Sequence, residues 1–113
     1  MAVKDVTDLL ERLEAFEDRL GVRLEAMSAQ LDVVDDDEVA YVVIQGELHP
    51  KSGTELEQSI ELIVAVYDSA SRVVATGTKH FYSSDFFGFE IFKISVEIYA
   101  TKLTRIIVQP KRG

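Results

Sequence analysis

The first twenty residues place apolar and polar side chains with the period of an α-helix. Their apolar positions recur at intervals of three or four residues and are Val6, Leu9, Leu13, Phe16 and Leu20. This spacing puts all of these side chains on one face of a helix. Gly21 follows at the point where a helix commonly ends in a left-handed residue. The pattern therefore predicts an amphipathic N-terminal helix over residues 1–20.

After Gly21 the pattern changes to a period of two, which is typical of strands with one buried face. The segments with alternating or continuously apolar, β-rich sequence are 22–33, 39–48, 60–68, 72–80, 92–98 and 103–109. A solvated acidic turn at Asp35–Glu38 and a loop at His49–Gly53 separate the early strands, and Pro110 stops the last one. Ser69–Ser71 is short enough to join two strands as a hairpin.

One helix followed only by strands excludes the alternation of strands and helices that builds a parallel sheet. Short connections between consecutive strands favour antiparallel pairing. We predict one domain over residues 1–113, with the helix in residues 1–20 and an antiparallel, immunoglobulin-like β-sandwich of about six to seven strands in residues 22–110. The alternative is an α+β roll in which the helix packs on one curved sheet. The helix distinguishes the two folds, because only in the roll does its apolar face cover a sheet.

One predicted hairpin resembles a known family. The segment from Ile60 to Thr78 reads Ile-Glu-Leu-Ile-Val-Ala-Val-Tyr-Asp-Ser-Ala-Ser-Arg-Val-Val-Ala-Thr-Gly-Thr. It resembles the hairpin of small bacterial immunoglobulin-like domains of the Phe-x-Leu-Tyr-Asp type, in which an apolar strand ends in Tyr-Asp. Tyr67–Asp68 and Val73–Val74 match that hairpin, whereas Val64 and Val66 stand where the motif has Phe and Leu. The resemblance implies a sandwich fold and a binding role, and it carries over no catalytic residue.

The composition narrows the possible partners. The chain has 113 residues and a net charge of −8, from 20 acidic and 12 basic side chains, and this acidic balance argues against nucleic-acid binding. It has no cysteine, so a disulfide scaffold, a thiolate metal site and a thiol nucleophile are all excluded. The charge is uneven: residues 1–60 contain 15 acids and 5 bases, and residues 61–113 contain 5 acids and 7 bases. Such asymmetry permits head-to-tail association or an anionic partner.

The sequence also bears on location. The N-terminal residues include acids where a signal peptide has an apolar core. The longest apolar runs, Val39–Ile44 and Leu62–Tyr67, contain six residues each. A membrane helix needs about 20 such residues. We expect a cytoplasmic protein with no membrane partner, although a chain without cysteine is equally compatible with export.

Candidate chemistry centres on two histidines. Glu47 and His49 stand two residues apart, which on a strand places both on one face, and His80 lies in another element. A small enzyme would have to bring these three side chains together. The sequence contains no phosphate-binding glycine loop and no nucleophile elbow, and a zinc site would lack cysteine ligands. We therefore expect no catalytic residue, no metal site and no cofactor.

The least ordinary feature is the concentration of aromatic residues in positions 81–92. Most of the chain's aromatic side chains lie there, and they are Phe81, Tyr82, Phe86, Phe87, Phe89 and Phe92. Gly88 and several polar residues interrupt the segment, so it cannot form one regular strand. We expect Phe92 in the core beside Ile94. The remaining phenylalanines cannot all face one side of a strand, so the loop either plugs the end of the sandwich or exposes an aromatic patch.

Three functions stay open at this point. We favour a non-enzymatic protein-interaction or assembly module that binds a protein partner or itself as a homo-oligomer. Its candidate interface residues are Tyr82, Phe86, Phe87, Phe89, Val6, Leu9, Leu13 and Phe16. The second function is the binding of a small apolar or carbohydrate ligand in a pocket lined by Tyr82 and the phenylalanines. The third is a small enzyme with a site built from Glu47, His49 and His80.

Overall fold

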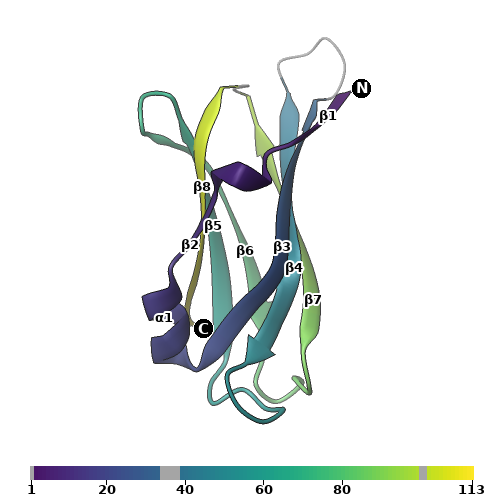
Figure 1. The fold of residues 1–113 in the computed structure, drawn as a ribbon, viewed down its shortest axis with the longest axis vertical. Coiled ribbons are helices and arrows are strands. Elements are labelled where there is room, and N and C mark those ends of the chain that lie inside the picture. The colour runs from purple at the N-terminus through teal and green to yellow at the C-terminus, as the bar shows by residue number, and fades with distance from the viewer. Residues whose placement is uncertain (1, 34–38, 100–101) are drawn as a thin grey trace.

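The chain folds into two four-stranded sheets that pack face to face (Figure 1). The computed structural model describes residues 2–33, 39–99 and 102–113. The first sheet contains, in spatial order, β1 (Ala2–Asp5), β3 (Val22–Val33), β4 (Ala40–Pro50) and β7 (Glu90–Ile98). The second sheet contains β2 (Leu10–Arg12), β8 (Leu103–Arg112), β5 (Ile60–Asp68) and β6 (Val73–Phe81). The prediction of a mainly β, sandwich-like domain is confirmed, and the alternative of one curved sheet is wrong.

Strand pairing is antiparallel throughout, except that β2 runs parallel to β8. Two hairpins stay within a sheet, β3–β4 in the first and β5–β6 in the second. The predicted hairpin between the Ile60 and Val73 strands is thereby confirmed. The chain changes sheet five times, between β1 and β2, β2 and β3, β4 and β5, β6 and β7, and β7 and β8.

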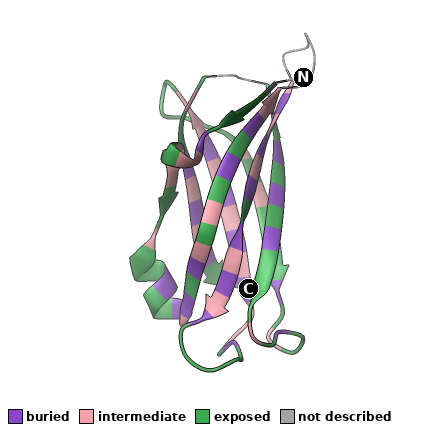
Figure 2. Ribbon diagram, turned by 45° about the vertical axis from the view of Figure 1, so that its right-hand side comes forward, coloured by how far each residue is buried: buried purple, intermediate pink, exposed green. Residues whose placement is uncertain are grey.

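The core lies between the two sheets and follows from the period of two in the sequence. Successive side chains of a strand point to opposite faces, so every second residue enters the core. Figure 2 shows this alternation as bands of buried and exposed residues along the long strands. The strands β4 and β5 supply many of the most deeply buried side chains, which are Ala40, Val42, Ile44, Leu48, Ile60, Leu62, Val64 and Val66.

The predicted helix over residues 1–20 is wrong for most of its length. Residues 2–12 form β1, the 3₁₀ turn η1 (Thr7–Leu9) and β2, and only α1 (Glu14–Leu20) is helical. Local hydrogen bonds stabilise the non-helical turn at this point, since the Thr7 N–H and hydroxyl both donate to Asp5 Oδ1, at 2.9 and 2.6 Å. Such local bonds compete with helix formation, and here they also hold the pKa of Asp5 below its ordinary value. The helix covers no sheet face and stands at one edge of the sandwich (Figure 1).

The end of α1 agrees with the sequence. Gly21 adopts a left-handed φ of 72°, and its N–H donates to the carbonyl oxygens of Asp18 and Glu17. A residue with a Cβ is strained in this conformation, and glycine is not. The predicted stop at Gly21 is confirmed, and it allows β3 to begin directly at Val22.

Two strands extend further than the sequence predicts. Pro50, predicted to lie in a loop, is the last residue of β4, and Pro110, predicted to end its strand, lies within β8. β4 runs through His49 to Pro50, and β8 runs through Pro110 to Arg112. Pro50 is the last residue of its strand, where a missing N–H costs little. Pro110 lies beyond the part of β8 that pairs with β2, so no strand on that side needs its N–H. The predicted acidic turn at Asp35–Glu38 lies outside the described residues.

A buried carboxylate joins three segments at the lower end of the molecule. Glu17 of α1 is only 2% exposed. Its oxygens accept hydrogen bonds from Arg12 Nε at 3.0 Å, from an Arg12 terminal nitrogen at 2.5 Å, and from the Leu24 N–H at 3.0 Å. The same contact raises the pKa of Arg12 above its ordinary value. Glu17 therefore connects β2 of the second sheet, α1 and β3 of the first sheet.

The two sheets come closest where their outer strands β6 and β7 meet. A Cβ atom at Gly77 of β6 would lie 2.8 Å from Val96 Cγ2 and 3.1 Å from Ile94 Cγ2, both in β7. These distances are too short for ordinary carbon contacts. Glycine at this position lets the edge of the second sheet close onto the first.

Replacing Arg12 with Met should lower the free energy of unfolding by about 2–3 kcal/mol, because it leaves the Glu17 carboxylate buried without its cation. This value is below the usual range for a buried pair, since the Arg12 side chain is 35% exposed. Urea denaturation followed by circular dichroism measures the loss. The control is Arg105→Met, which removes a bidentate pair with Glu11 that is exposed on both sides. Equal losses in the two variants would contradict the role assigned to Glu17.

Gly77→Ala should destabilise the fold by about 1–2 kcal/mol, because the added methyl group must displace Val96 or Ile94. The neighbouring Thr76→Ala removes atoms from an exposed position and should change stability by less than about 0.5 kcal/mol. Thermal and urea denaturation of both variants compare the two effects. A Gly77→Ala protein as stable as the wild type would show that β6 and β7 can separate without cost.

Candidate functional site

The aromatic segment divides its side chains between the core and the surface. Phe81 and Phe92 are each 2% exposed and stack edge-to-face at 6.2 Å. Phe86 is 4% exposed and packs edge-to-face on Phe81 at 6.4 Å. Phe86 thus closes the end of the sandwich, as the plug interpretation predicted for this segment. The core position of Phe92 is confirmed.

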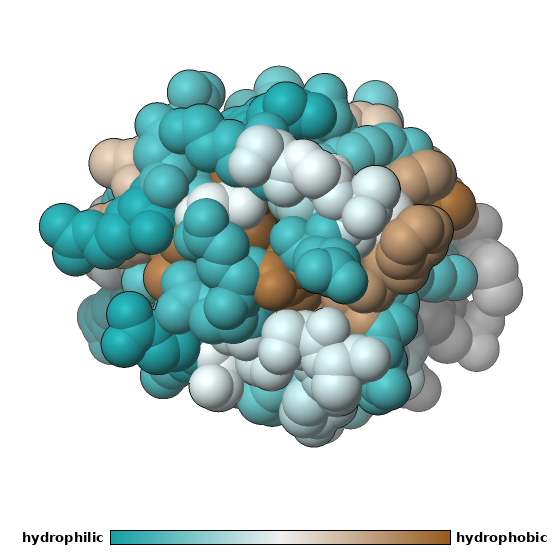
Figure 3. All heavy atoms as spheres, turned by 90° about the horizontal axis from the view of Figure 1, so that it is seen from below, coloured by the Kyte–Doolittle hydropathy of each residue, from teal (hydrophilic) through white to brown (hydrophobic). Residues whose placement is uncertain are grey.

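Three neighbouring apolar side chains remain in contact with solvent. Phe87 is 75% exposed, Phe89 is 48% exposed and Ile91 is 74% exposed. We call these three residues the apolar patch. They follow one another at alternate positions where the loop enters β7. Figure 3, which views this end of the molecule, shows apolar side chains gathered on one side of it. The segment therefore supplies both alternatives drawn from the sequence, a plug from Phe86 and an exposed surface from Phe87 and Phe89.

The loop that carries the patch is held by hydrogen bonds to the loop between β4 and β5. Gly88 has a φ of 78°, and its N–H donates to the Thr54 carbonyl oxygen at 2.8 Å. The Ser83 N–H donates to Ser59 Oγ at 3.0 Å. Gly88 turns the backbone between Phe87 and Phe89. Its hydrogen bond to Thr54 therefore fixes the orientation of the backbone that carries these two side chains.

The imidazole of His49 packs against Phe89, one residue of the apolar patch. Its ring stacks on Phe89 with 4.9 Å between centroids and 6° between planes. The same imidazole lies 2.9 Å from Glu47 Oε1 and 3.5 Å from Glu25 Oε2. The expected placement of Glu47 and His49 on one strand face is confirmed. The two carboxylates hold the imidazole, and the imidazole in turn holds Phe89 on the outer face of the first sheet.

His80 and Tyr82 lie elsewhere. His80 pairs with Glu61 at 2.9 Å on the outer face of the second sheet, and it stacks on Tyr82 with 6.0 Å between ring centroids. Tyr82 is 59% exposed. His49 and His80 thus stand on opposite outer faces, separated by both sheets, whose backbones alone are about 10 Å apart. The enzyme site proposed from Glu47, His49 and His80 is therefore wrong.

The N-terminal candidates do not form one exposed face. Val6 is 5% exposed and belongs to the core, Leu9 packs against it, and Leu13 is half-buried. Because the expected single helix does not exist, these residues lie in different segments. Val6 precedes η1, Leu9 lies in η1, Leu13 lies between β2 and α1, and Phe16 lies in α1. Phe16 alone keeps substantial exposure, at 39%.

Two residues that sequence reasoning missed have recognisable signals. Ile91 stands one position before Phe92, so the alternation that buries Phe92 must turn Ile91 outward. Glu17 lies between Leu13 and Leu20 at helical spacing, so its carboxylate falls on the buried side of α1. The exposure of Ile91 and the burial of Glu17 both follow from the periodicity of the strand and the helix that contain them.

The described part of the chain offers no metal cluster, and it contains surface depressions that the aromatic segment does not line. Within residues 2–33, 39–99 and 102–113, no group of three or more His, Asp or Glu side chains is placed to hold a metal ion. One shallow groove lies between α1 and β8, and another depression is lined by residues 52–57. Neither is lined by an aromatic residue of positions 81–92. Among the helices of the described residues, none has the length and apolar character needed to cross a membrane.

Comparison with known proteins finds no matching family model, no matching curated protein and no matching solved structure.

Phe86→Ala should destabilise the fold by about 3 kcal/mol, because it empties a buried aromatic position. Phe87→Ala, one residue away, should change stability by less than about 0.5 kcal/mol, because that side chain already contacts solvent. Urea denaturation of the two variants tests the division between plug and surface. Similar losses from both substitutions would show that Phe87 also packs in the folded protein.

Proposed function

We propose that this protein is a non-enzymatic β-sandwich module that acts by protein contact and associates with a second copy of itself. The observation that carries the proposal is the apolar patch, where Phe87, Phe89 and Ile91 are exposed together. Large apolar side chains gathered on a folded surface are typical of protein interfaces.

The patch is also preorganised for contact. The Gly88–Thr54 hydrogen bond fixes the loop, and stacking on His49 fixes the Phe89 ring. An interface built from side chains that are already ordered loses less conformational entropy on association. Aromatic residues at the centre of such a surface supply most of the binding energy, and polar residues around them exclude water. A contact centred on three apolar side chains is small, and we expect it to support association at roughly micromolar concentrations rather than an obligate dimer.

The proposed module is of the immunoglobulin-like class, and the strand order supports this assignment. β3, β4 and β7 occupy the places of strands A, B and E, and β6, β5 and β8 occupy those of C′, C and F. From β3 onward the chain changes sheet three times, and each change is one that this strand order requires. The three residues of β2 take part of the place of strand G, in parallel instead of antiparallel pairing with β8. The Tyr67–Asp68 and Val73–Val74 resemblance then falls on the C–C′ hairpin.

Binding of a small apolar or carbohydrate ligand by the aromatic segment is the weaker proposal. Tyr82 stacks on His80 of the second sheet, whereas Phe89 stacks on His49 of the first. Side chains divided in this way do not enclose one ligand. An extended contact with another protein makes better use of the patch.

The test is sedimentation velocity of the purified protein over a range of micromolar concentrations. We expect the wild type to shift from monomer toward dimer, and the double variant Phe87→Ser/Ile91→Thr to dimerise more than tenfold more weakly, since central apolar contacts dominate such interfaces. The matched control is Val73→Thr/Val74→Thr, which removes two exposed apolar side chains, 51% and 40% exposed, from β6. Circular dichroism establishes that all variants fold.

Two results would refute the proposal. If the wild-type protein stays monomeric at every concentration, self-association is excluded. Equal weakening by the patch variant and the β6 variant would show that association does not depend on Phe87 and Ile91.

A further inference from the structure

We infer that the groove between α1 and the end of β8 binds a free monocarboxylate that carries a short apolar chain. This site is separate from the apolar patch and goes beyond the proposed function. The groove has a volume of about 300 Å³. Its lining residues are Phe16, Arg19, Leu20, Gln109, Pro110, Lys111 and Arg112.

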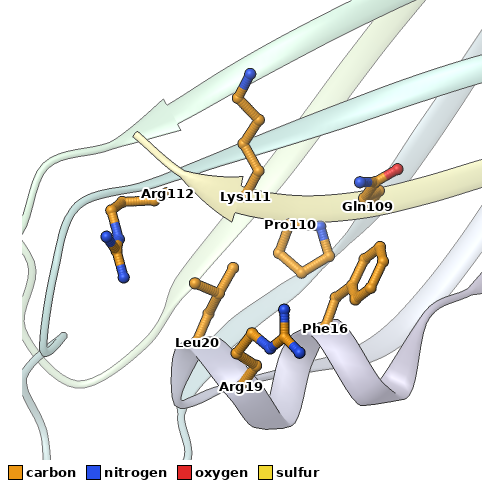
Figure 4. A pocket seen from close by; sticks show the side chains of 7 residues that line it. All are labelled: Phe16, Arg19, Leu20, Gln109, Pro110, Lys111 and Arg112. Atoms are coloured by element: carbon orange, nitrogen blue, oxygen red, sulfur yellow. The ribbon is translucent and has the colours of Figure 1, made fainter.

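The groove exists because β2 is short. β2 pairs with β8 only as far as Val108, and the chain then turns into α1. Beyond Val108 the edge of β8 faces the helix instead of another strand. Phe16 and Leu20, one helical turn apart, project from α1 toward Pro110 and form an apolar floor (Figure 4).

Pro110 decides which kind of ligand suits this edge. An extended peptide that binds to a strand edge depends on main-chain hydrogen bonds from that strand. Pro110 has no N–H to offer, and proline is one of the residues that block such pairing. A ligand that needs no backbone partner, such as an acyl chain, is therefore favoured over a peptide strand.

The charge around the groove selects an anion. None of its seven lining residues is acidic and three are cationic, in a chain with a net charge of −8. The Arg19 guanidinium points into the groove between Phe16 and Leu20 (Figure 4). Within the part of the chain that the structure describes, Arg19 forms no ion pair. Arginine binds carboxylates through two parallel hydrogen bonds, which makes Arg19 the expected partner of the ligand head group.

The other two cations, Lys111 and Arg112, already contact other side chains. Lys111 Nζ lies 3.9 Å from Glu61 Oε1, on the outer face of the second sheet. Arg112 Nε donates to Gln58 Oε1 at 2.8 Å. These side chains raise the positive potential at the rim, and Arg19 supplies the direct contact. The apolar chain of the ligand then lies on Phe16, Leu20 and Pro110.

Titration of the ¹⁵N-labelled protein with sodium decanoate, decanol and sodium acetate tests the site by nuclear magnetic resonance. We expect decanoate to shift the Arg19 Nε–H signal and the Leu20 and Gln109 amide signals in a saturable manner. Decanol, which lacks the charge, should bind about tenfold more weakly, in line with the strength of a hydrogen bond between charged groups. Acetate, which lacks the chain, should give no saturable shift.

Variants separate the two parts of the ligand. Arg19→Gln should lower the affinity for decanoate to that for decanol, and Phe16→Ser should lower the affinity for both. Arg72→Gln changes an exposed arginine in the β5–β6 turn and should leave both affinities unchanged. Equal affinities for decanoate and decanol, or an Arg19→Gln protein that binds decanoate as the wild type does, would overturn the proposal. So would shifts confined to the apolar patch, or binding of a short peptide with a free C-terminal carboxylate in place of decanoate.

Discussion

The buried carboxylate of Glu17 is the contact on which the lower end of the molecule depends. The chain must pass from the second sheet at Arg12 to the first sheet at Val22, and Glu17 ties both ends of that passage together. From there a series of hydrogen bonds leads outward. The Lys51 N–H donates to the Gly21 carbonyl oxygen at 2.8 Å, which places the β4–β5 loop, and that loop binds Gly88 through Thr54. A charge that is costly to bury thus fixes α1, the groove beside it and, through two loops, the apolar patch.

The aromatic segment shows how one residue type acquires different roles within a few positions. Phe86 and Phe92 enter the core, while Phe87 and Phe89 face solvent. Nothing in the chemistry of the side chain distinguishes them. The difference comes from the phase of the backbone, which Gly88 resets by turning through a left-handed conformation. The plug stabilises the end of the sandwich, and it gives the exposed side chains a rigid base. The packing of Phe86 in the core therefore also holds the backbone that exposes Phe87 and Phe89.

The sequence predicts the strands after Gly21 well because each has one face in the core, and a period of two is then required. It fails before Gly21 for an equally physical reason. The intervals between Val6, Leu9 and Leu13 suit a helix, but they also suit the observed course, in which Val6 follows β1, Leu9 lies in η1 and Leu13 lies between β2 and α1. The choice is made by the pairing of Leu10–Arg12 with Ile106–Val108, almost a hundred residues away. Local spacing carries no information about such a contact, and tertiary packing overrides it. Of the two proposed surfaces, the aromatic concentration is visible in the sequence, but the groove is not, since it arises only where β2 ends.

The charge of the chain is distributed unevenly between the two sheets, so that the first sheet is the more acidic and the second the more basic. Residues 1–60, with 15 acids and 5 bases, supply three of the four strands of the first sheet, whereas the slightly basic remainder supplies three of the four strands of the second. The apolar patch borders the first sheet, with Glu25 and Glu47 beneath Phe89. A symmetrical contact through the patch would bring two acidic faces together, so charge opposes it and apolar burial must supply the attraction. The groove is formed at the edge of the more basic sheet, and three of its seven lining residues are cationic while none is acidic. In the two proposals, the surfaces at this end of the molecule would therefore bind by different forces, the patch by apolar contact and the groove by charge together with a short apolar floor.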